Sequence, residues 1–192
     1  MQGAADSGAS GNKGSMKGYF GIGVEGVSKP ANVGALMRTA HAFGASFAFT
    51  IAPVTDIKGF RAADTSEAAK NVPLYTYDSV EALDLPSGCD LVGIELLDES
   101  IDLPSFRHPR QAAYVLGPER GGLSPELVAR CAHVVRIPTR FSINLSLAGA
   151  LVMYDRLLTL GRHAPRPVRA GGPTEALPPH VHGAPAFKRP RP

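Results

Sequence analysis

Residues Tyr19 to Ile51, which read YFGIGVEGVSKPANVGALMRTAHAFGASFAFTI, decide the fold class of this chain. Short apolar runs at Tyr19–Val24 and Ser46–Ile51 flank a segment from Asn32 to Phe43 in which apolar residues recur at helical spacing. Gly44 follows this segment and is suited to end a helix. Two apolar strands joined by a helix are typical of a parallel β–α–β unit.

The same alternation of apolar runs and helical patterns continues along the chain. We expect further strands at Leu74–Tyr77, Asp90–Glu95, Ala112–Leu116 and His133–Ile137, and further helices at Thr65–Lys70, Pro125–Cys131 and Asn144–Leu160. The pattern therefore predicts an α/β fold, a parallel-sheet α/β sandwich. Ligands of such sheets bind at the carboxyl ends of the strands, so the loops after Val24, Glu95, Leu116 and Ile137 are the candidate site.

The 192 residues suit one domain with disordered ends. We expect a disordered leader over residues 1–16, a folded unit over 17–163 and a proline-rich, basic, disordered tail over 164–192. No apolar run is long enough for a transmembrane helix, so we expect no membrane partner. Two cysteines are too few for a disulfide scaffold, which favours a cytoplasmic location.

The net charge of +3 is unevenly distributed along the sequence. Residues 161–192 hold six basic residues and one acidic residue, whereas residues 17–160 hold 13 basic and 15 acidic residues. A basic tail of this kind either contacts nucleic acid or an acidic surface, or is simply solvated. Composition alone leaves both possibilities open.

Three loops carry residues that suit a binding site. The first, EGVSKPANVGALMR, ends at Arg38 and has Asn32 near the predicted helix start. The second, LGPERGGLSP, contains Glu119 and three glycines that allow a ligand to approach the backbone. The third, IPTRFSINLSLAGA, places Ser142 and Asn144 at a helix start. Each loop taken alone is equally consistent with ordinary helix capping or a tight connection.

In this order, the segments NVGALMR, LGPERGG and IPTRFSINLSLAGAL resemble the three motifs of the SPOUT superfamily of RNA methyltransferases, in its TrmH/SpoU branch. The resemblance covers about residues 19–160. It implies a SPOUT fold, in which the C-terminal part of the α/β domain forms a deep trefoil knot. It also implies a homodimer, S-adenosylmethionine as the cofactor, no metal, and methyl transfer to a ribose 2′-hydroxyl of RNA.

The resemblance further implies which residues form the site. Arg38 matches the essential catalytic position, and Asn32, Glu119, Ser142 and Asn144 match residues that organise the catalytic site. The matching cofactor-binding positions are Ile94, Leu116, Gly117, Gly121, Ile137 and Ile143. Because a guanidinium is a poor base, we expect Arg38 to bind a substrate phosphate or the developing alkoxide.

The RNA target and the activity each have an alternative. A compact chain without a separate RNA-binding domain favours tRNA over rRNA as the substrate. A catalytically silent, RNA-binding member of the superfamily is the second alternative, although the five catalytic-site positions are intact. An unrelated nucleotide-binding α/β protein is disfavoured, because neither a P-loop nor a dinucleotide-binding glycine fingerprint is present.

Overall fold

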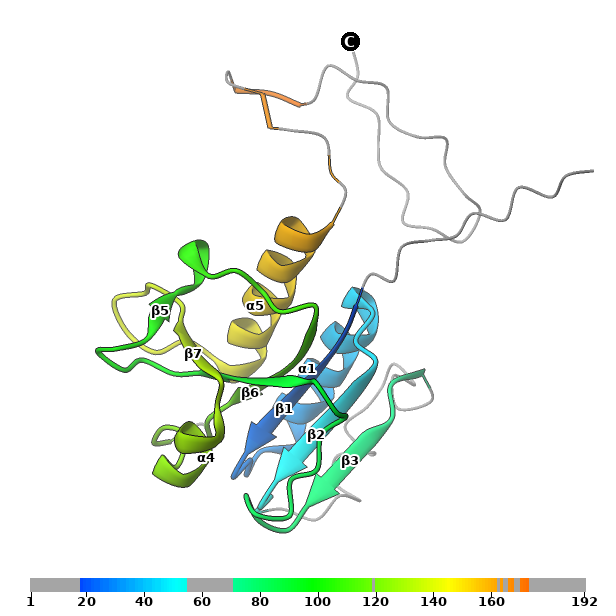
Figure 1. Cartoon of the computed structure of the whole chain (residues 1–192), viewed down its shortest axis with the longest axis vertical. Coiled ribbons are helices and arrows are strands. Elements are labelled where there is room, and N and C mark those ends of the chain that lie inside the picture. The colour runs from blue at the N-terminus through cyan, green and yellow to red at the C-terminus, as the bar shows by residue number, and fades with distance from the viewer. Residues whose placement is uncertain are drawn as a thin grey trace, which may run out of the picture. The chain divides into compact units, whose positions relative to one another are not determined.

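The computed structural model describes residues 18–54, 71–118, 120–161, 163, 166–167 and 170–172 (Figure 1). The predicted leader and helix Thr65–Lys70 lie outside the described residues, and so does most of the predicted tail. The strands are β1 (Tyr19–Glu25), β2 (Phe47–Ile51), β3 (Leu74–Tyr77), β4 (Asp90–Ile94), β5 (Ile101–Asp102), β6 (Gln111–Leu116) and β7 (His133–Arg136). The helices are α1 (Pro30–Phe43), α4 (Pro125–Arg130), α5 (Leu145–Leu160) and the 3-10 turn η1 (Leu103–Ser105).

All seven described strands form one parallel sheet in the order β3-β2-β1-β6-β4-β7-β5. The prediction of a parallel-sheet α/β fold is confirmed. The central strand β1 carries glycines where its neighbour β2 carries phenylalanines, with Gly21 opposite Phe47 and Gly23 opposite Phe49. A Cβ atom at Gly21 would lie 2.2 Å from the Phe47 ring, so the missing side chains make room for these rings.

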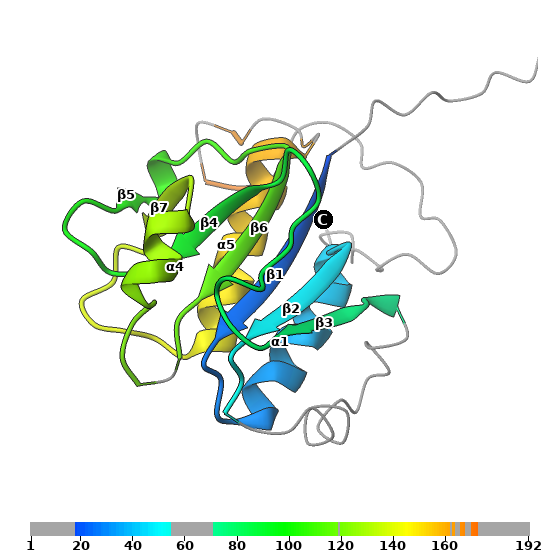
Figure 2. The same cartoon turned by 60° about the horizontal axis from the view of Figure 1, so that its bottom comes forward.

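Helices cover both faces of the sheet (Figure 2). On one face, α1 and α5 pack side by side in a core that includes Leu36, Met37 and Val152. On the other face, α4 contributes Leu127 to a second core with the β2 phenylalanines. No helix in the described part of the chain is both long enough and apolar enough to cross a membrane.

Helix α1 begins two residues earlier than the sequence predicts. Pro30 occupies its first turn, where the missing backbone N–H costs no hydrogen bond. The predicted end is correct, because Gly44 adopts a left-handed conformation (φ 73°) and donates its N–H to the carbonyls of Ala40 and His41. Asn32 therefore lies within the first turn of the helix, not before it.

The small residues near the start of α5 allow it to pack closely on α1. A Cβ atom at Gly149 would lie 2.4 Å from Leu36 Cδ1 and 3.2 Å from Ile22 Cδ1. The expectation that small residues here permit close approach by a neighbouring segment is confirmed. This packing fixes the start of α5 over the carboxyl-terminal half of the sheet.

The short strand β5 and the turn η1 were not predicted. Two residues are too few to show an apolar alternation, and β5 is defined mainly by its pairing with β7. Asp102 of β5 also accepts a hydrogen bond from Arg136 Nε of β7 at 2.6 Å. A pairing between neighbouring strands, rather than a local pattern, therefore specifies this edge of the sheet.

A buried polar network joins the second half of α5 to the segment that leads into β6. Arg156 is 5% exposed and donates to the carbonyl oxygens of Tyr19, Pro109 and Arg110 and to the Tyr114 hydroxyl. The Tyr114 hydroxyl also lies 2.6 Å from His108 Nδ1, and His108 Nε2 lies 3.0 Å from an Asp155 carboxylate oxygen. Burial raises the pKa of Tyr114 to about 12, so this hydroxyl stays protonated at neutral pH.

Candidate active site

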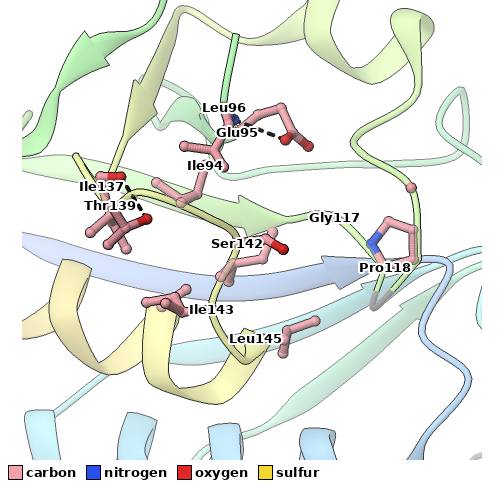
Figure 3. Close-up of a pocket in the computed structure, with 13 residues that line it drawn as sticks. Ile94, Glu95, Leu96, Gly117, Pro118, Ile137, Thr139, Ser142, Ile143 and Leu145 are labelled. Carbon is pink, nitrogen blue, oxygen red and sulfur yellow. Dashed lines mark hydrogen bonds between the residues drawn. The ribbon is translucent and has the colours of Figure 1, made fainter.

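A pocket of about 210 Å³ opens at the carboxyl edge of the sheet, between the loops that follow β4, β6 and β7 and the start of α5 (Figure 3). Its lining is mostly apolar or backbone, with two hydroxyl side chains and one carboxylate. The lining residues are Ile94, Glu95, Leu96, Leu116, Gly117, Pro118, Gly121, Ile137, Thr139, Ser142, Ile143, Leu145 and Ala148. Three of the four loops that the parallel-sheet argument selects therefore contribute to this pocket.

All six positions predicted to bind the cofactor line this pocket. Ile94 ends β4, Leu116 and Gly117 follow one another at the end of β6, and Gly121 lies in the next loop. Ile137 follows β7, and Ile143 precedes α5. The chain thus brings together residues from three separate loops, although what they bind stays a prediction.

A side-chain hydrogen bond connects the first and third predicted motifs. Asn144 Nδ2 donates to Asn32 Oδ1 at 3.3 Å. Asn144 is also the N-cap of α5, because its Oδ1 accepts from the backbone N–H of Ser146 at 2.9 Å and from Ser146 Oγ at 2.6 Å. Since Oδ1 is occupied by the cap, the amide nitrogen of Asn144 is directed to Asn32.

The other three predicted catalytic residues are placed differently. Ser142 lines the pocket, within two residues of Asn144. Arg38 is exposed on α1 and is not among the residues that line the pocket. Six residues separate it from Asn32, so ideal helical rotation puts the two on different faces, as the sequence argument expects. Glu119 lies outside the described residues.

Two carboxylates that the sequence analysis did not select brace the second loop. Glu25, which ends β1 and is 8% exposed, accepts from the backbone N–H of Ser124 at 2.8 Å and from its hydroxyl at 2.5 Å. Glu95, which follows β4, accepts from the backbone N–H of Leu123 at 2.7 Å. The available signal was a single acidic residue at the end of an otherwise apolar strand.

Glycines in the second loop leave space for the Glu95 carboxylate. A Cβ atom at Gly122 would lie 2.7 Å from Glu95 Oε2, and one at Gly117 would lie 3.3 Å from the same oxygen. The Gly117 Cβ would also lie 3.0 Å from the backbone of Gly122. Larger residues would therefore push the loop away from the pocket wall.

The cysteines do not add a reactive group to the site. Burial raises the pKa of the Cys131 thiol to about 11, so this thiol is protonated at neutral pH. Its Sγ donates to the Leu127 carbonyl at 3.2 Å. Among the residues that the structure describes, no three His, Cys, Asp or Glu side chains are grouped as a metal site requires.

Comparisons with known proteins agree in one family. A sequence model of the SpoU rRNA Methylase family matches residues 20–154. A tRNA (guanosine(18)-2′-O)-methyltransferase from Escherichia coli is 27% identical over 139 residues, which are 69% of this chain and 60% of that protein. A 23S rRNA (guanosine-2′-O-)-methyltransferase from Neisseria meningitidis is 31% identical over 141 residues, which are 69% of this chain and 55% of that protein.

A solved structure described as giving insight into 2-OH methylation of C/U34 on tRNA superposes with a TM-score of 0.65 at 25% identity. The match covers 76% of this chain and 99% of that chain. By contrast, this chain spans less than two thirds of the length of both curated relatives.

Proposed function

The chain belongs to the SpoU rRNA methylase family, and from this premise we propose that it is an RNA methyltransferase that uses S-adenosylmethionine and methylates a ribose 2′-hydroxyl. The observation that carries the proposal is the convergence of the three motifs at one edge of the sheet. The second and third motifs line a common pocket, and the first is joined to the third by the hydrogen bond between Asn144 and Asn32.

The pocket residues fit an adenosyl group. Ile94, Ile137 and Ile143 supply apolar surface on which a purine can pack, and Gly117 and Gly121 bring polar backbone groups to the same pocket. The space beside Gly117 and Gly122 is one that a Cβ atom would fill. When bound, S-adenosylmethionine supplies a methyl group that is already activated by its sulfonium.

The protein must then align the ribose hydroxyl with the methyl group and manage its proton. We assign Arg38 to this task, as a fork that binds the substrate phosphate or the developing alkoxide, with any proton acceptance limited to the bound complex. Ser142 and the hydrogen-bonded pair Asn32 and Asn144 orient the substrate and the start of α5. Glu119 is assigned to orient Arg38 or Asn32.

We also propose that the C-terminal part of the domain forms the deep trefoil knot of the SPOUT fold. The strand order supports this proposal, because the chain after β4 returns to the interior of the sheet twice. It returns first as β6, between β1 and β4, and then as β7, between β4 and β5. Two such returns bring the loops after β6 and β7 into contact with the same pocket.

We propose that the protein is a homodimer that uses the outer face of α5. Leu147, Leu151, Tyr154 and Leu157 recur at helical spacing on this helix and are 59%, 43%, 49% and 42% exposed. An apolar stripe of this kind favours association over exposure to water. A second copy of the chain is the occupant that the family resemblance implies.

The substitution Leu151→Glu is expected to weaken the dimer at least roughly tenfold, because it replaces apolar surface by charge. Sedimentation equilibrium measures the dissociation constant, and circular dichroism checks the fold. Tyr75→Glu, at an exposed residue of β3, is the matched control and should leave association unchanged. Equal dissociation constants for Leu151→Glu and the parent protein would exclude this face.

The proposed activity is tested in two steps. S-adenosylmethionine at about 100 times its dissociation constant should raise the melting temperature by roughly 5–10 °C, since it binds only the folded state. Ribose-methylation mapping of RNA from cells with and without the protein should then show one position that loses its methyl group, and we propose that this position lies in tRNA. An unchanged melting temperature together with an unchanged methylation map would refute the activity.

A further inference from the structure

One carboxylate stands out in the lining of the candidate pocket. Among the described residues that line it, Glu95 is the only ionisable side chain, and the others are apolar, glycine, proline or hydroxyl residues. Figure 3 shows Glu95 between Leu96 and the Gly117 segment, on the wall opposite Ile143 and Leu145. A charged group in such a setting costs free energy unless it is well bonded.

Two backbone groups hold the Glu95 carboxylate in one orientation. Its Oε1 accepts from the N–H of Leu96 at 2.9 Å, and its Oε2 accepts from the N–H of Leu123 at 2.7 Å. These donors come from the loops after β4 and β6, so the carboxylate links two walls of the pocket. Each carboxylate oxygen has acceptor capacity for one further donor. The fixed group is therefore prepared to accept hydrogen bonds from a ligand.

We propose that Glu95 accepts hydrogen bonds from the ribose hydroxyls of the adenosyl group of the methyl donor. The inference rests on the proposed function, and it deepens that function by naming a donor-binding residue outside the predicted set. A carboxylate is well suited to a vicinal diol, because two adjacent hydroxyls can donate to its two oxygens.

The alternative partner for the carboxylate is the sulfonium centre, and the chemistry disfavours it. Methyl transfer removes the positive charge from sulfur, so a carboxylate in contact with sulfur would stabilise the starting state more than the transition state. The ribose hydroxyls keep the same charge throughout the transfer. A carboxylate bonded to them contributes to binding without opposing the reaction.

The test measures the affinity of the full-length protein for S-adenosylhomocysteine and for its 2′-deoxy and 3′-deoxy analogues, by isothermal titration calorimetry. The parent protein is expected to bind at least one deoxy analogue about 10–100-fold more weakly, the range for a lost hydrogen bond to a charged group. In Glu95→Gln, the deoxy and parent ligands are expected to bind with nearly equal, weakened affinity.

The substitution Glu25→Gln is the matched control. Glu25 braces the same loop through Ser124 but does not line the pocket. If loop bracing alone mattered, both variants would lower affinity for all ligands by a similar factor. The inference requires Glu25→Gln to keep the parent protein's discrimination against the deoxy analogues, and Glu95→Gln to lose it.

Each outcome separates this inference from the proposed function. Equal affinity of the parent protein for all three ligands would overturn the ribose assignment without any variant, even if Glu95→Gln does not fold. A Glu95→Gln variant that loses affinity for S-adenosylmethionine but not for S-adenosylhomocysteine would assign the carboxylate to the sulfonium instead. Failure of the parent protein to bind either ligand would instead count against the proposed function.

Discussion

Replacement of Arg38 by alanine is expected to abolish methyl transfer while the affinity for S-adenosylmethionine stays nearly unchanged. Arg38 does not line the candidate donor pocket, so its loss removes no contact there. Its proposed role is to stabilise charge on the RNA during the transfer. The loss of one such donor lowers a rate by roughly 100–1,000-fold. Transfer of a radiolabelled methyl group to the RNA measures the rate, and calorimetry measures donor affinity.

The conservative variant Arg38→Lys tests how the guanidinium acts. Lysine keeps the positive charge but lacks the planar fork, so it should restore only a small part of the rate. His41→Ala, at an exposed residue one turn further along α1, is the control and should retain full activity. Turnover near the parent rate in Arg38→Ala would refute the assignment of Arg38. A loss of donor affinity equal to the loss of rate would place Arg38 in donor binding.

Replacement of Arg156 by leucine is expected to lower the free energy of unfolding by about 3–5 kcal/mol, the range for disruption of a buried charged network. The guanidinium is buried, and its four described hydrogen-bond partners are neutral oxygen atoms. It also lies over the Phe20 ring, 5.1 Å from the centroid. Leucine would leave three backbone carbonyls and the Tyr114 hydroxyl without this donor. Urea denaturation measures the change.

A second variant keeps this prediction testable if Arg156→Leu does not fold. Arg156→Lys retains the charge but cannot reach all four oxygens at once, so an intermediate loss of stability is expected. Arg107→Ala, at an exposed residue near the same segment, is the control and should change stability by less than about 0.5 kcal/mol. A loss below about 1 kcal/mol in Arg156→Leu would mean that the four acceptors find other partners.

Local patterns were sufficient to predict the sheet and most element boundaries. The apolar runs at β1, β2, β4 and β6 are each buried on both faces, which makes them visible without a partner. Gly44 could be assigned to the end of α1 because only its own conformation matters there. The exception is β5, which has too few residues to carry a pattern of its own.

The contacts that complete the site could not be predicted in this way, because they join distant parts of the sequence. Asn144 meets Asn32 only after the sheet has formed, and capping predicted one of its hydrogen bonds but not the other. Glu95 reaches Leu123 across a neighbouring strand, so its role depends on strand order. A lone acidic residue after an apolar strand does not reveal its partner.

Arg156 shows the same limit for the core. In the sequence it is one basic residue in the second half of an amphipathic helix, where a solvated position is the usual expectation. Its burial follows from three carbonyls at Tyr19, Pro109 and Arg110 that lie where β1 and β6 begin. These carbonyls become neighbours only through the pairing of β1 with β6.

The pairing of β1 with β6 also bears on how the chain folds. Tyr19 pairs with Gln111 and Val24 with Leu116, so the centre of the sheet closes a long loop. Closing a long loop costs chain entropy before its contacts are formed, and chains with many distant contacts fold slowly. During synthesis, β1 can pair with β2 early but must wait for most of the chain before its other edge is covered. Until then that edge is open to pairing with another chain, which makes nascent chains vulnerable to aggregation.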